Sequence, residues 1–169
     1  MIVLCVVVTV AAHSTTLPVI DWAKRVVASE DQPVWKKSLA SKALSGNVST
    51  MLAKTTRYSD KNYLDPFTGG GPDGCTWTNP DGHQFDSVRL RYGYVAADTR
   101  HHPTGTVMFA GAPYNRTWIV VDCGPGVKGR RHIDVYHSDR ATWNWYAKNV
   151  NGPVKCWVLG RITRAQAQM

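Results

Sequence analysis

Three aspartates stand where short apolar segments end or are interrupted, an unusual position for a charged side chain. Asp98 follows Val-Ala-Ala, Asp122 follows Val-Val, and Asp134 lies between Ile and Val-Tyr. A carboxylate that emerges from a buried strand is costly unless it is paired, hydrogen-bonded or used in chemistry. Positioned carboxyl groups serve as general acids and bases in enzymes. The pattern therefore makes these three residues the candidate catalytic groups.

Each aspartate also has a structural explanation. Asp98 could cap the turn before Pro103, and Asp122 could accept hydrogen bonds from the backbone of the Gly-Pro-Gly turn that follows it. For these two residues the structural and the catalytic explanations stay open side by side. Asp134 lies in an otherwise apolar strand, and there catalysis is favoured over structure.

Other polar residues lie close to the aspartates in the sequence. The glycines after Asp122 permit tight turns that would bring Lys128 back toward the carboxylates. Four histidines do not have the spacing of metal ligands, so we predict solvent-exposed histidines, no metal site and no other cofactor. They are His101, His102, His132 and His137.

A β-rich domain over residues 49–162 must position these groups. Short β-prone segments alternate there with Gly, Pro and Asp turns. One helix interrupts them, capped near Ser138-Asp139 and reaching Ala147. Many short strands with one inserted helix favour a closed β-barrel over a parallel α/β sheet. Strands are predicted at Met51–Tyr58, Val88–Val95, Gly105–Phe109, Thr117–Val121, Ile133–Tyr136 and Val154–Leu159.

Helices flank or decorate this domain. Residues 15–48 form a predicted helical appendage, because apolar residues recur at helical spacing over 19–30 and 34–44, the second after a proline at a tolerated position. Residues 163–169 are predicted to be a short tail. The inserted helix carries three aromatic residues that we expect on its buried face: Trp143, Trp145 and Tyr146.

The first twelve residues are uncharged and nearly all apolar. The segment is too short to span a bilayer as a helix. It fits the apolar core and small-residue end of a signal peptide over residues 1–14, although the basic start of such a peptide is missing, and a buried strand is the alternative. We therefore expect a protein that is secreted or associated with the cell wall, without stable membrane insertion.

The net charge indicates which kinds of partner the protein could bind, and the cysteine content indicates which disulfides it could form. Lys and Arg number 20 against 12 Asp and Glu, a formal charge of +8 that attracts polyanions. The basic residues are scattered, without the runs typical of nucleic-acid binding, so we predict no nucleic-acid partner.

Three cysteines follow the apolar first segment: Cys75, Cys123 and Cys156. They permit either one disulfide with a spare thiol or three reduced thiols, and the sequence does not say which two would pair.

Three ordered motifs carry a resemblance to a known family. They read Ala-Asp98-Thr followed by His-Pro-Thr-Gly-Thr106, then Asp122-Cys-Gly-Pro-Gly-Val-Lys-Gly129, and Ile-Asp134-Val-Tyr. With Thr-Arg-Tyr58 upstream and a closing Val-Lys-Cys-Trp-Val-Leu strand, they resemble the 3D domain, named for its three aspartates. That domain is found in muralytic stationary-phase-survival proteins and at the C-terminal end of membrane-bound lytic transglycosylase A. The resemblance covers residues 50–160, with one residue more than usual before the third aspartate.

The resemblance implies a fold and an activity. The fold is mainly β, a six-stranded double-psi β-barrel with the aspartates at one end of a substrate groove. The activity is that of a lytic transglycosylase, which cleaves the β-1,4 bond between MurNAc and GlcNAc in peptidoglycan glycan strands. Asp134 would be the single general acid/base, while Asp98 and Asp122 shape the site. The residues implied to contact substrate or a neighbouring aspartate are Thr56, Tyr58, Lys128 and Gly129.

Two other activities fit the same residues. An expansin-like module would bind wall polysaccharide without cutting it. A hydrolase would use Asp134 as acid and a second aspartate as base, as ordinary glycosidases do. A transglycosylase needs only one carboxyl group because the substrate's own 6-hydroxyl is the nucleophile. The sequence leaves the oligomeric state open.

Overall fold

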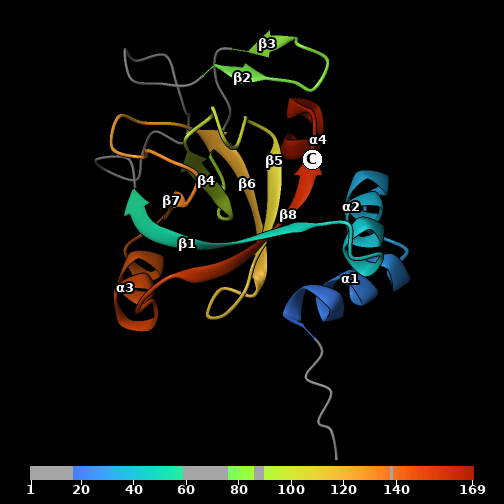
Figure 1. The fold of residues 1–169 in the computed structure, drawn as a ribbon, viewed down its shortest axis with the longest axis horizontal. Helices are drawn as coiled ribbons and strands as arrows, with labels where there is room; N and C mark the ends of the chain where they lie inside the picture. The colour runs from blue at the N-terminus through green and yellow to red at the C-terminus, as the bar shows by residue number, and fades with distance from the viewer. Residues whose placement is uncertain (1–16, 59–75, 86–89, 138) are drawn as a thin grey trace, which may run out of the picture.

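The computed structural model describes residues 17–58, 76–85, 90–137 and 139–169. At its centre is a closed barrel with the strand order β1-β7-β4-β6-β5-β8 (Figure 1). This mixed six-stranded barrel is consistent with a double-psi β-barrel, and the predicted mainly β fold is confirmed. The barrel strands are β1 (Ser49–Tyr58), β4 (Tyr94–Ala97), β5 (Thr106–Ala110), β6 (Arg116–Asp122), β7 (His132–Tyr136) and β8 (Val154–Arg161).

The barrel combines parallel and antiparallel ladders. β1 runs parallel to β7, and β4 runs parallel to β6. The remaining four ladders, β1–β8, β4–β7, β5–β6 and β5–β8, are antiparallel. Parallel neighbours require long connections. The β1–β7 ladder therefore joins residues far apart in the chain, such as Thr56 and Asp134.

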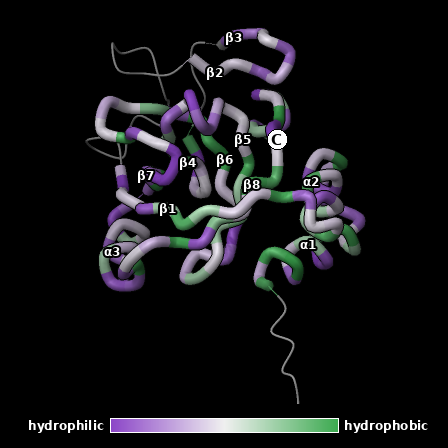
Figure 2. The backbone as a smooth tube through the Cα atoms, viewed as in Figure 1, coloured by the Kyte–Doolittle hydropathy of each residue, from purple (hydrophilic) through white to green (hydrophobic). Residues whose placement is uncertain are grey.

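Alternation along the strands gives the barrel a buried interior and a covered outer face. The interior cluster takes side chains from all six strands, among them Ala53, Val95, Met108, Trp118, Ile133 and Cys156. The residues that alternate with these along the strands point outward, and several of them, including Phe109 and Trp157, belong to a second cluster outside the barrel. Figure 2 shows hydrophobic residues concentrated along these strands.

Two N-terminal helices cover part of the outer face, on one side of the barrel (Figure 1). α1 (Pro18–Ala28) and α2 (Val34–Leu44) lie within two residues of the helices predicted from the apolar spacing. The ring of Trp22 packs on that of Phe109, with centroids 5.6 Å apart. The appendage is therefore part of the hydrophobic core of the described chain.

The inserted helix is confirmed, including its cap. α3 (Arg140–Asn149) begins after Asp139, whose side chain accepts a hydrogen bond from the backbone N–H of Thr142 at 2.8 Å. The aromatic residues lie on the inner face of α3, where Trp145 and Tyr146 pack against the hydrophobic cluster of the barrel interior. They are half-buried, and no residue of α3 is fully buried.

Some elements differ from the predicted ones. Residues 88 and 89 of the strand predicted at Val88–Val95 lie outside the described residues. From residue 90 on, the strand begins at Tyr94, because Gly93 adopts a φ of +100° in a turn closed by a hydrogen bond from Tyr94 N–H to Arg91 O. A small hairpin, β2 (Trp77–Thr78) with β3 (Gln84–Phe85), was not predicted.

The chain termini add two findings. A short helix, α4 (Arg164–Gln168), occupies the segment predicted to be a tail and begins with a capping box between Thr163 and Gln166. The predicted signal peptide lies outside the described residues. Within those that are described, no helix is both long and apolar enough to traverse a bilayer.

Candidate active site

One row of residues crosses four adjacent strands and contains two of the three aspartates. The register pairs Thr56 with Asp134, Asp134 with Ala96, and Ala96 with Asp122. Paired residues point to the same face of a sheet, and neighbouring strands lie about 4.8 Å apart. The Cα atoms of Asp134 and Asp122 are therefore about 10 Å apart, with only the methyl group of Ala96 between them.

An irregularity in β6 brings Asp122 into this row. Val95 pairs with Val120, but the next residue, Ala96, pairs with Asp122, so Val121 is an extra residue in the ladder. Without it, strand alternation would turn Asp122 toward the barrel interior, where Val120 lies. Bulges of this kind re-aim side chains and are frequent beside active sites.

Asp134 carries a half-buried carboxyl group on the outer face of β7. Its Oδ1 atom is buried and has no hydrogen-bond partner among the described residues. Burial raises the pKa of Asp134, while a hydrogen bond from Thr56 and the charge of His132 act in the opposite direction. A raised pKa brings a carboxyl group closer to the range in which it serves as a general acid.

Tyr58 lies two residues beyond Thr56 on the same face of β1. Its ring packs against that of Tyr136, with centroids 5.5 Å apart. Burial, followed by the negative charges of Asp122 and Asp134, raises the pKa of Tyr58 well above its ordinary value. Its hydroxyl is buried and has no partner in the described part of the chain. A buried, unpaired hydroxyl close to two carboxyl groups is suited to a polar ligand.

Asp98 lies outside this row and anchors a turn after β4. Its carboxylate accepts hydrogen bonds from Arg100 Nε at 2.9 Å and Nη2 at 2.6 Å, and from the backbone N–H of Gly129 at 2.8 Å. These bonds hold the pKa of Asp98 well below its usual range, and the bonds from the Arg100 side chain contribute most. The geometry is that of the structural explanation, an aspartate that joins its own turn to the loop at Gly129.

The glycine-rich loop after Asp122 contacts Asp98 through its backbone rather than through Lys128. The cation beside Asp98 is Arg100, whereas the side chain of Lys128 is exposed. Gly129 directs its N–H to Asp98. The role of Lys128 and Gly129 in substrate binding stays a prediction. Sequence reasoning missed Arg100, although an arginine two residues after a candidate aspartate indicates a local ion pair.

The four histidines do not share one environment, which corrects the expectation that all are exposed. His101 is exposed, but His102 is buried with Nε2 2.7 Å from Arg130 O. His137 is fully buried edge-on to the ring of Tyr146, and burial lowers the pKa of His137 to about 4. Over the described ranges, no three His, Cys, Asp or Glu side chains gather as a metal site would require.

His132 belongs to the site, although it was not among the residues predicted to bind or catalyse. Its Nε2 atom lies 2.8 Å from Thr56 Oγ1, across the β1–β7 ladder. His132 and Asp134 are two residues apart in one strand and therefore share a face. That spacing is the pattern by which the sequence could have indicated it.

Contacts from α3 fix the strand that carries Thr56. The guanidinium of Arg57 stacks 4.0 Å from the ring centre of Trp143 and donates a hydrogen bond to the Trp143 carbonyl at 2.8 Å. The hydroxyl of Tyr146 donates to the carbonyl of Thr55 at 2.7 Å. α3 thus holds residues on both sides of Thr56.

A disulfide lies next to the row. Cys123, which follows Asp122 directly, is disulfide-bonded, and its partner lies outside the described residues, as Cys75 does. Cys156 is a buried free thiol in the barrel interior. The alternative of three reduced cysteines is therefore wrong.

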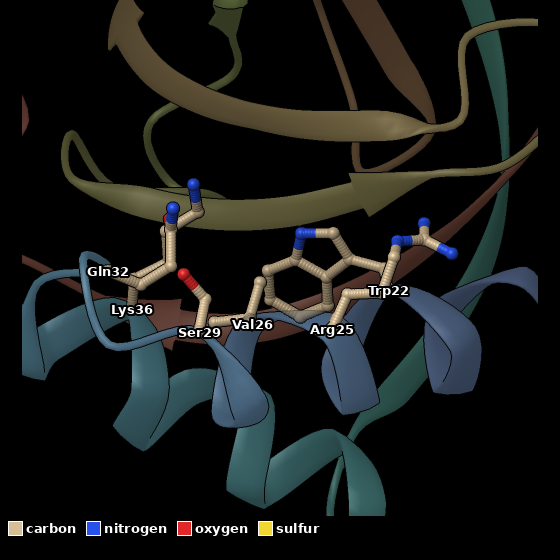
Figure 3. Close-up of a pocket in the computed structure, with 6 residues that line it drawn as sticks. All are labelled: Trp22, Arg25, Val26, Ser29, Gln32 and Lys36. Atoms are coloured by element: carbon tan, nitrogen blue, oxygen red, sulfur yellow. The ribbon is translucent and has the colours of Figure 1, made fainter.

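A separate hollow of about 290 Å³ lies at the helical appendage. Figure 3 shows side chains from α1, α2 and their connection extending toward the barrel strands. In Figure 1 these helices are well separated from the end of β1 that carries Tyr58. The hollow is therefore distinct from the Asp134 row. Its lining residues are Trp22, Arg25, Val26, Ser29, Gln32 and Lys36.

Comparison with known families agrees with this arrangement. Residues 93–160 match the family model described as the 3D domain. Over these residues the chain is similar to the 3D domain family. The matched segment includes all three aspartates, while β1, with Thr56 and Tyr58, precedes it. 3D domains are associated with proteins that act on peptidoglycan, which is compatible with a function at the cell wall. No curated protein matches the chain.

Proposed function

We propose that this 3D-domain protein is a secreted lytic transglycosylase that cleaves the MurNAc–GlcNAc bond of peptidoglycan, with Asp134 as its general acid and base. The observation that carries the proposal is the state of Asp134, a half-buried carboxyl group with a raised pKa and one oxygen that has no hydrogen-bond partner among the described residues. The Tyr58 hydroxyl, which likewise has no partner in the described ranges, supports a polar substrate at this place. The charge of +8 favours binding to an anionic wall.

In the proposed reaction Asp134 first donates a proton and then accepts one, so that its protonation state is restored at the end. Asp134 gives its proton to the bridging oxygen while the bond from that oxygen to C1 of MurNAc breaks. The Asp134 carboxylate then takes the proton of the MurNAc 6-hydroxyl, whose oxygen bonds to C1 and closes a 1,6-anhydro ring. Asp134 ends protonated, as it began, so the reaction requires neither a second catalytic carboxyl group nor a water molecule.

The neighbouring residues have supporting roles in this proposal. Positive charge develops on the sugar ring as the bond breaks, and the carboxylate of Asp122 on the same face favours it. Thr56 stabilises the ionised form of Asp134, and Tyr58 binds a sugar hydroxyl. Asp98 keeps the glycine-rich loop in place through Gly129.

Mass spectrometry of the products from purified peptidoglycan tests the proposal. Wild-type protein is compared with Asp134→Asn and with Asp81→Asn, a control at an exposed aspartate outside the barrel. We expect anhydro-muropeptides from wild type and from the control, and about 10²- to 10⁴-fold less product from Asp134→Asn. Reducing-end products would instead establish hydrolysis. Retention on the wall without soluble products would refute an enzyme and indicate a binding module.

A further inference from the structure

The Thr56 hydroxyl lies between a histidine and the proposed catalytic carboxyl group. Thr56 is the register partner of Asp134 across the β1–β7 ladder, so the two side chains lie next to each other on one face, where Thr56 lowers the pKa of Asp134. His132, two residues before Asp134 on the same strand face, reaches diagonally to Thr56 with an Nε2–Oγ1 distance of 2.8 Å. The three side chains thus form one chain of contacts from imidazole to hydroxyl to carboxyl group.

A threonine hydroxyl has a single proton to donate. If the Thr56 proton points to Asp134, it stabilises the carboxylate, and Thr56 Oγ1 then accepts from a protonated Nε2 of His132. If the same proton points to an unprotonated Nε2, the carboxylate loses that donor and the acid form of Asp134 is favoured. The hydrogen-bonded state of His132 and the protonation state of Asp134 are therefore linked through one rotating hydroxyl.

We propose that His132 is a positioning residue that sets the protonation state of Asp134 through the Thr56 hydroxyl. The inference rests on the proposed role of Asp134 as acid and base. That role requires Asp134 to lose and regain a proton in each turnover. His132 donates its Nε2 proton to Thr56 Oγ1, so the Thr56 proton points to Asp134 and favours the carboxylate that each turnover must form.

Few other charges face this chain of contacts. β1 contributes Lys54, the register partner of His132, and Tyr58. β6 contributes Asp122, and β4 places Ala96 between the two aspartates. Of these residues, His132 alone contacts the Thr56 hydroxyl directly.

Titration of the Asp134 carboxyl carbon by NMR tests the inference without any substrate. We expect the pKa of Asp134 to rise in Thr56→Val, which loses the hydroxyl, and to rise in His132→Phe. The decisive measurement is the double variant, in which His132→Phe should add little to the shift already caused by Thr56→Val. Thr56→Ser should restore the wild-type value, and Thr50→Val, at an exposed threonine of the same strand, should not change it.

The outcomes separate this inference from the proposed function. Additive shifts in the double variant, or an unchanged pKa in His132→Phe, would overturn the linkage through Thr56. His132→Gln repeats the test if the phenylalanine variant does not fold. A linked titration without any peptidoglycan cleavage would retain the inference and overturn the function. In an active protein, the limb of the pH–rate profile that reports Asp134 should move in the same direction as the NMR titration.

Discussion

Replacement of Gly105 by alanine should destabilise the barrel severely, because two features of the position act together. Gly105 has a φ of +84°, and a Cβ atom there would lie 2.3 Å from the carbonyl oxygen of Ile162 and 3.1 Å from Cζ2 of the fully buried Trp77. Its own backbone groups are both engaged, the N–H with Val120 O at 2.8 Å and the carbonyl with Ile162 N–H at 2.9 Å. The methyl group cannot enter without moving backbone.

The expected loss follows from these contacts. The left-handed conformation costs an alanine about 1–2 kcal/mol. Forcing extra volume into a packed region costs about 1–3 kcal/mol. We therefore expect Gly105→Ala to lower the free energy of unfolding by about 3–4 kcal/mol, a large part of the 5–15 kcal/mol of an ordinary domain.

Gly46→Ala is the matched control for this prediction. Gly46 has a similar φ of +73°, but nothing lies within 4 Å of the Cβ position. Its loss should be the conformational cost alone, about 1–2 kcal/mol. Urea unfolding followed by tryptophan fluorescence gives both values. Equal losses in the two variants would refute the close approach of Gly105 to the strand end at Ile162.

Four further predictions concern two of the aspartates, the core and the disulfide. Asp134→Asn should raise Tm at neutral pH, since burial makes the ionised form unfavourable in the folded state; the gain should disappear as the pH falls through the raised folded pKa of Asp134. Asp98→Asn should lower Tm at neutral pH, and its effect should shrink below about pH 4, where the stabilisation due to the depressed pKa is lost. Calorimetry at several pH values measures both, and shifts of equal sign would contradict the different roles. Trp118→Ala, in the barrel interior, should cost about 3–5 kcal/mol in urea unfolding, and a loss below 1 kcal/mol would contradict its full burial. Cys123→Ser should cost about 2–5 kcal/mol, and adding reductant should destabilise the wild type but leave this variant unchanged.

The elements of the fold could be predicted where the sequence has a strong period. The apolar spacing of Val19, Trp22 and Val26 indicated α1, and the same reasoning located α2. The strand ends were less accessible, because the turn before Tyr94 depends on a backbone conformation of Gly93 that hydropathy does not express. Short elements such as the β2–β3 hairpin depend on tertiary contacts rather than on local pattern.

The site could be predicted in its members but not in its grouping. The sequence presented Asp98 and Asp122 with the same two explanations. A single extra residue, Val121, brings Asp122 into the row with Asp134, and no alternation rule predicts such a bulge. The two-residue spacing of His132 and Asp134 indicates that they share a strand face, but the contact of His132 with Thr56 depends on a register between strands that are remote in the sequence.

The parallel pairing of β1 with β7 also determines when the site can exist. Thr56 and His132 are 76 residues apart in the chain, and contacts across such separations form late because a long loop must first close. A growing chain completes β1 before β7, and until β7 has been made Thr56 has no Asp134 beside it. Any cutting activity of Asp134 is thus confined to chains in which β7 and β8 have been made and the barrel has closed.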